Sequence, residues 1–107
     1  MKKEVVAKKG PLDRYLVQNP ELAWREIDGQ AAIVEPAGGT LYVLNEVGSF
    51  VWKNIEKPAK ISAVAKKITT AFEVGKEQAQ EDLLAFVDEL ASIGVLTISD
   101  SKPAAGE

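Results

Sequence analysis

The sequence predicts an α+β domain of the winged helix-turn-helix type, in which an N-terminal three-stranded antiparallel sheet is followed by three helices and a short closing strand. Three observations support this prediction. Strand-like runs separated by turn signals occupy residues 22–44, apolar residues recur at helical spacing over residues 46–93, and a short apolar run follows at residues 95–98. The 107 residues are enough for one domain.

The predicted sheet consists of three strands. Residues 22–27 alternate in polarity and end at Asp28-Gly29, a pair that strongly favours a two-residue hairpin turn. Residues 31–35 return as the second strand, and residues 40–44, which are rich in β-formers, are the third. Both faces of this third strand are apolar, which is unsuitable for a sheet with one face in water. We therefore expect other groups to cover both of its faces.

Helical signals follow the sheet. Asn45 is a good N-cap for the first helix. The second helix is predicted over residues 61–72, and the third runs from about residue 76 to residue 93. Gly94 then takes the position after the last turn, where the left-handed backbone favours glycine. Residues 95–98 are the closing strand.

The domain is predicted to extend over residues 12–98, and residues 12–18 are a candidate for an additional short strand. We expect the lysine-rich residues 1–11 to form a flexible arm and the small, polar residues 99–107 to form a disordered tail. No stretch has the apolar length of a signal peptide or of a membrane span. We therefore expect a cytoplasmic protein that does not contact a membrane.

The absence of two residue types restricts the chemistry. The chain has no Cys and no His, which excludes Cys nucleophiles, Ser-His-Asp triads, disulfides and zinc sites built from imidazole or thiolate. The spacing of the acidic residues does not match a calcium-binding loop. We therefore expect a protein that is not an enzyme and that holds neither a metal nor a cofactor.

The third predicted helix has an unusually wide apolar surface. Leu84 and Ala91 extend its apolar arc to one side, with Glu81 and Asp88 just beyond, so that the arc spans roughly 180°. A surface helix needs an apolar stripe of only about 100°. Two interpretations remain open, namely a well-buried last helix and a groove wall with an acidic lip.

The same helix argues against nucleic-acid binding. A winged helix that regulates transcription would place its third helix in a DNA groove. Residues 76–93 hold five acidic residues against one lysine, a net charge of −4, and the whole chain carries −3. Because a phosphate-lined groove requires the opposite sign, a DNA-binding regulator is the less favoured alternative.

The sequence resembles the PqqD family at the junction between the third strand and the first helix. In that family a strand ends in Leu-Asn, a small residue follows three positions on, and a Trp or Leu closes the helix. The matching residues here are Leu44, Asn45, Gly48 and Trp52. The resemblance extends over roughly residues 22–98, and it departs from many members at residues 57–59, where an Asp-Gly pair is common.

The resemblance implies a recognition element for ribosomally made, modified peptides (RiPPs). Domains of this kind bind the leader part of a precursor peptide and present it to a modifying enzyme, often a radical SAM enzyme. In the pyrroloquinoline quinone pathway, that peptide is the quinone precursor. The resemblance further implies that the leader adds as a strand beside residues 40–44, in a cleft against the third helix.

The energetics of strand addition indicate which residues such a site needs. An edge strand offers unpaired N–H and C=O groups, but four or five hydrogen bonds contribute only about 2–7 kcal/mol. A micromolar complex needs about 8 kcal/mol, so guest side chains must also be buried in an apolar groove. The candidate peptide-binding residues are Thr40, Leu41, Tyr42, Val43 and Leu44 on the third strand and Gln80, Leu84, Asp88 and Ala91 on the third helix.

Overall fold

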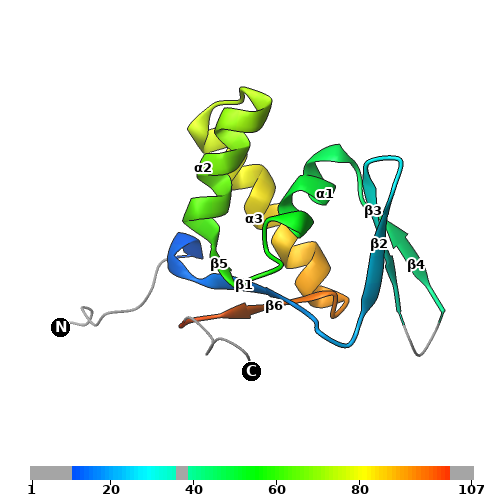
Figure 1. The fold of residues 1–107 in the computed structure, drawn as a ribbon. Coiled ribbons are helices and arrows are strands. Elements are labelled where there is room, and N and C mark those ends of the chain that lie inside the picture. Colours follow the sequence, from blue (N-terminus) through cyan, green and yellow to red (C-terminus); the bar gives the residue numbers. More distant parts are fainter. Residues whose placement is uncertain (1–10, 36–38, 102–107) are drawn as a thin grey trace.

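A computed structural model of the chain describes residues 11–35 and 39–101 (Figure 1). Its elements, in chain order, are the 3₁₀ turn η1 (Pro11–Asp13), β1 (Tyr15–Gln18), β2 (Ala23–Ile27), β3 (Gln30–Val34), β4 (Leu41–Val43), α1 (Glu46–Lys53), β5 (Ala59–Lys60), α2 (Ile61–Phe72), α3 (Lys76–Ser92) and β6 (Leu96–Ser99). This order confirms the predicted α+β fold. Most of the predicted arm and tail, residues 1–10 and 102–107, lies outside the described residues.

The strands form two antiparallel sheets. One has the order β2-β3-β4 and is the predicted three-stranded sheet, and the other has the order β5-β1-β6. The candidate strand at residues 12–18 is present in its second part only, as β1 (Tyr15–Gln18), because its first residues belong to η1. The closing strand β6 pairs with β1. The two-residue strand β5 was not predicted, because it is too short to show a pattern and exists only through its pairing with β1.

The hairpin between β2 and β3 is closed as the sequence indicates. Asp28 and Gly29 both have positive φ, 53° and 84°, as a tight hairpin turn that matches the strand twist requires. The register places Trp24 opposite Ile33 and Ile33 opposite Tyr42. These three side chains therefore lie in one row on the same face of the sheet.

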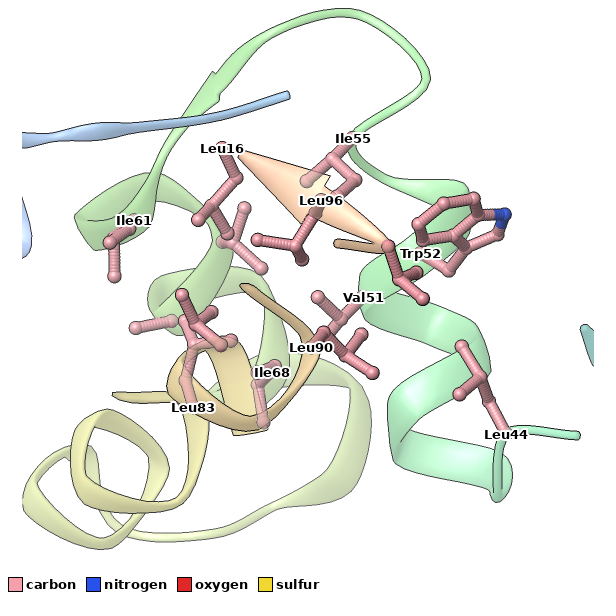
Figure 2. Close-up of a cluster of buried hydrophobic side chains, with 14 of the residues drawn as sticks. Leu16, Leu44, Val51, Trp52, Ile55, Ile61, Ile68, Leu83, Leu90 and Leu96 are labelled. Atoms are coloured by element: carbon pink, nitrogen blue, oxygen red, sulfur yellow. The ribbon is translucent and has the colours of Figure 1, made fainter. Parts of the chain in front are cut away.

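The core lies between the helices and the two sheets. Figure 2 shows buried apolar side chains that converge from β1, all three helices and β6. Trp52 of α1 is almost fully buried and meets Trp24 of β2 edge to face, with ring centroids 6.1 Å apart. This contact seats the hairpin on the first helix.

The junction between β4 and α1 is fixed by three polar contacts. The side-chain oxygen of Asn45 accepts a hydrogen bond from the Gly48 N–H at 2.8 Å, which confirms the predicted N-cap. The buried Ser49 hydroxyl accepts from the Ala31 N–H at 2.7 Å and donates to the Leu44 carbonyl at 3.1 Å. The direction in which β4 enters α1 is thus set by side-chain hydrogen bonds.

Candidate functional site

The outer edge of β4 has backbone groups that point away from its partner strand. The Glu35 N–H donates to the Thr40 carbonyl and the Leu44 N–H donates to the Ala31 carbonyl, both at 2.9 Å. In an antiparallel pair this direction alternates, so the N–H and C=O groups of Leu41 and Val43 point to the opposite side. Among the described residues β4 pairs with β3 alone, so these four groups face an open edge.

The side chains of β4 alternate between a covered and an uncovered face. Tyr42 is half-buried and Leu44 is buried, and both belong to the inner face. Leu41 and Val43 are 56% and 57% exposed on the outer face. The expectation that both faces are covered is therefore wrong for the outer face, at least within the described residues. The reason is that the helices pack on one side of this sheet only.

The uncovered outer face continues across the sheet. The exposed large apolar side chains on it are Ile27, Val34, Leu41 and Val43, one or two from each strand. Val34 lies opposite Leu41 in the register, which makes the two direct cross-strand neighbours. The open edge of β4 thus has an apolar surface on its outer side.

Two hollows lie on the inner side, one near each end of β4. The first, about 260 Å³, lies between the start of α1, the second half of α2 and the first half of α3, and its lining includes Asn45, Val47, Asp82 and Phe86. The second, about 340 Å³, lies at the other end, and its lining includes Glu21, Glu35, Tyr42 and Ile93. Asn45 follows β4 and Glu35 pairs with Thr40 before it, so one hollow lies beyond each end of β4. We call the space between β4 and the side of α3 that lines both hollows the groove.

One flank of α3 borders both hollows. Asp82 and Phe86 line the first hollow and Ile93 lines the second. These residues are four and seven positions apart and therefore share a face of the helix, together with Glu89. We call Asp82, Phe86, Glu89 and Ile93 the groove flank of α3. Ile93 is 43% exposed, so this flank offers apolar surface that a guest can cover.

The helix residues predicted for the site lie on the opposite flank. Gln80 lines a different hollow, with Leu12 of η1 and Lys66 of α2. Leu84, Asp88 and Ala91 follow Gln80 at helical spacing and share its side of α3. Leu84 and Ala91 are half-buried against the core, which corresponds to the well-buried interpretation of the wide apolar arc. The structure therefore brings residues 40–44 together at one edge but does not bring these four helix residues to it.

The sequence pattern alone did not identify the groove flank of α3. A helical wheel gives the width of an apolar arc but not the identity of the element that covers each side. The available signal was Gly48, because a small residue early in a helix permits close approach of another element. That element is the Phe86 ring, and a Cβ atom built on Gly48 would lie 2.9 Å from its Cε1 atom.

The charged residues that line the two hollows are all acidic. They are Asp82 in the first and Glu21 and Glu35 in the second. Asp82 accepts a hydrogen bond from the Gln78 side chain at 2.8 Å, and its position on α3 is exposed. Within residues 11–35 and 39–101 the acidic residues form no cluster of three that could hold a metal ion. The described helices also include none that is long and apolar enough to cross a membrane.

Comparisons with known proteins identify the family and the fold of the chain. The family model described as coenzyme PQQ synthesis protein D (PqqD) matches residues 24–96. No curated protein matches the sequence significantly. Among solved structures, the chain is similar to TbiB1 in complex with the TbiA(beta) leader peptide, with a TM-score of 0.70 and 22% identity over 75% of this chain and 93% of that one.

A second solved structure has the same fold. It is a lasso peptide synthetase B1 complexed with the leader peptide, with a TM-score of 0.69 and 21% identity. The match covers 77% of this chain and 96% of that one. At these identities, the two likenesses establish the fold.

Proposed function

Because the chain belongs to the PqqD family, we propose that it is a non-catalytic peptide-binding protein of RiPP biosynthesis. It captures the leader of a precursor peptide as a strand added beside β4 and presents the peptide to a modifying enzyme, of the radical SAM class. The peptide is the pyrroloquinoline quinone precursor or that of a related modified peptide. The observation that carries the proposal is the open edge of β4 beside a groove bordered by α3.

The backbone of the edge defines how a guest strand would lie. The outward N–H and C=O groups of Leu41 and Val43 pair with two guest residues, whose side chains then fall on the outer face. The guest residue between them lies opposite Tyr42 and directs its side chain to the inner face. A guest of alternating apolar residues therefore covers Leu41 and Val43 outside and fills the groove inside.

The similar structures support the same kind of guest. Both are described as complexes with leader peptides. Strand addition is a general mode of peptide recognition in which main-chain hydrogen bonds supply affinity and pockets for alternate side chains supply specificity. The edge of β4 and the two hollows correspond to these two contributions.

A DNA-binding function is not favoured. Helix α3, which would enter a DNA groove, carries the net charge of −4 noted above. The charged residues that line the two hollows beside β4 are acidic as well. A phosphate backbone would be repelled by both surfaces.

The proposal is tested by titrating the ¹⁵N-labelled protein with synthetic leaders of short precursor peptides encoded beside its gene. We expect saturable shifts of the backbone amides of residues 40–44 and of the groove flank of α3. Shifts on the flank of Gln80 and Leu84 instead would place the guest elsewhere. Absence of saturable binding to every such leader would refute the proposal.

A further inference from the structure

Acidic side chains lie at both ends of the groove, where they favour basic residues in a bound peptide. Building on the proposed function, we infer that the leader has Lys or Arg at inward-facing positions on both sides of an apolar centre. The acidic partners are Asp82 at one end and Glu35, with Glu21, at the other. The substrate class is therefore an extended peptide with apolar residues at its centre and Lys or Arg on both sides of them.

The positions of the acidic residues follow from the topology. Asp82 shares the first hollow with Asn45, the residue two places beyond the end of β4. Glu35 forms a backbone pair with Thr40 just before β4, and it shares the second hollow with Tyr42. A strand that runs along the edge of β4 in either direction passes one acidic end and then the other.

The orientation of Glu35 supports its role. Along β3, Ala31 and Ile33 are buried on the inner face, and the period of two places Glu35 on that face as well. Glu35 is half-buried and lines the second hollow. A guest side chain on the inner face near Thr40 therefore approaches this carboxylate.

Strand geometry fixes the spacing of the guest pattern. The guest residue opposite Tyr42 points inward, and the next inward residues are two positions away on each side, at about 7 Å. An inward apolar side chain at the centre lies beside Tyr42, at the border of the second hollow. Basic side chains two to four positions from the centre reach the acidic ends with their long stems.

These charges contribute specificity more than affinity. Asp82 and Glu21 are exposed, and exposed ion pairs are individually weak and screened by salt. Complementary charges nevertheless fix register and discriminate against acidic guests. The expected signature is a preference for basic peptides that weakens as the salt concentration rises.

The test is a selection from a surface-displayed library of random twelve-residue peptides against the full-length protein. We expect the enriched peptides to combine an apolar centre of alternating residues with Lys or Arg two to four positions away on both sides. The selection is repeated with Asp82→Lys and with Glu35→Lys. Each substitution is expected to convert the preference to Asp or Glu at one end of the peptide only, and the two substitutions act at opposite ends.

Asp88→Lys is the matched control for Asp82→Lys, because Asp88 is also an exposed acidic residue of α3 but lies on the flank away from β4. It should leave the selected pattern unchanged. For an enriched basic peptide, we expect Asp82→Lys and Glu35→Lys each to weaken binding about three- to tenfold at about 50 mM salt, and less at higher salt.

The outcomes separate this inference from the proposed function. Two results would overturn the inference and leave the proposed function standing. Either the peptides that bind at the β4 edge have no charge preference, or their preference is the same for the native protein, Asp82→Lys and Glu35→Lys. Peptides whose binding is insensitive to Val43→Pro, which blocks that edge, would contradict both. The same holds if no peptide binds saturably.

Discussion

Gly48 of α1 lies directly against the ring of Phe86 in α3. A Cβ atom at position 48 would lie 2.9 Å from Cε1 and 3.0 Å from Cζ of that ring, closer than side chains normally pack. The contact joins the helix that follows β4 to the helix that borders the groove. The close approach of these two helices thus depends on the absence of a side chain at position 48.

We expect Gly48→Ala to lower the free energy of unfolding. Overpacking costs about 1–3 kcal/mol, against which the better helix propensity of Ala returns about 1 kcal/mol. Equilibrium denaturation of Gly48→Ala, Phe86→Leu and the double variant gives the coupling energy. If the overpacking explanation holds, Gly48→Ala costs less in the Phe86→Leu background than in the native one. Additive effects would contradict the contact.

The Ser49 hydroxyl is expected to be a major polar contribution to stability. Ser49→Ala leaves the Ala31 N–H buried without its 2.7 Å acceptor, which costs about 1–3 kcal/mol. Chemical denaturation measures this loss. The control is Ser92→Ala, because Ser92 is exposed and its hydroxyl donates only to the Glu89 carbonyl within its own helix. Equal effects of the two substitutions would show that the contact at Ser49 is unimportant.

Two proline substitutions distinguish the two edges of β4. Val43→Pro removes an N–H that points to the open edge, so we expect leader binding to fall at least tenfold while the melting temperature changes little. Tyr42→Pro removes an N–H on the side of β3 and should destabilise the fold by about 1–3 kcal/mol. Isothermal titration and thermal melting provide the measurements. The reverse pattern would show that the assignment of the edges is inverted.

The two flanks of α3 are distinguished by a pair of aspartate substitutions. Ile93 is exposed on the groove flank, so Ile93→Asp should weaken leader binding roughly tenfold with little loss of stability. Leu84 is half-buried against the core, so Leu84→Asp should lower the free energy of unfolding by about 2 kcal/mol or more. Binding assays on both variants, with denaturation as the control, decide between the flanks. If Leu84→Asp is stable but binds the leader more weakly, the peptide contacts the flank of α3 that carries Gln80 and Leu84.

Local chemistry made much of the fold predictable. Asn45 accepts from its own first turn, Asp28 and Gly29 adopt positive φ, and Gly94 has φ 81° after α3. Each of these features depends on neighbours a few residues away, so the sequence pattern contains the information. The open edge of β4, by contrast, was an expectation that the family resemblance implied.

The remaining features depend on contacts between distant segments. β5 has two residues and is defined only by pairing with β1, and β6 pairs with the same strand. Which flank of α3 faces the groove is decided by the packing of Phe86 on Gly48, and periodicity alone cannot choose between two sides of an apolar arc. The candidate residues 40–44 therefore lie together at the open edge, whereas the candidate helix residues lie on the flank of α3 away from it.

The edge-to-face contact of Trp24 and Trp52 allows the packing of the hairpin on α1 to be followed by tryptophan spectroscopy. The two indoles lie at 89° to each other, one on the hairpin and one on the first helix, and they are the only tryptophans in the chain. Near-ultraviolet circular dichroism depends on the fixed surroundings of each indole, so we expect this signal to change when the hairpin separates from the helix. Detachment of the hairpin can thus be followed separately from helix melting, without an attached dye.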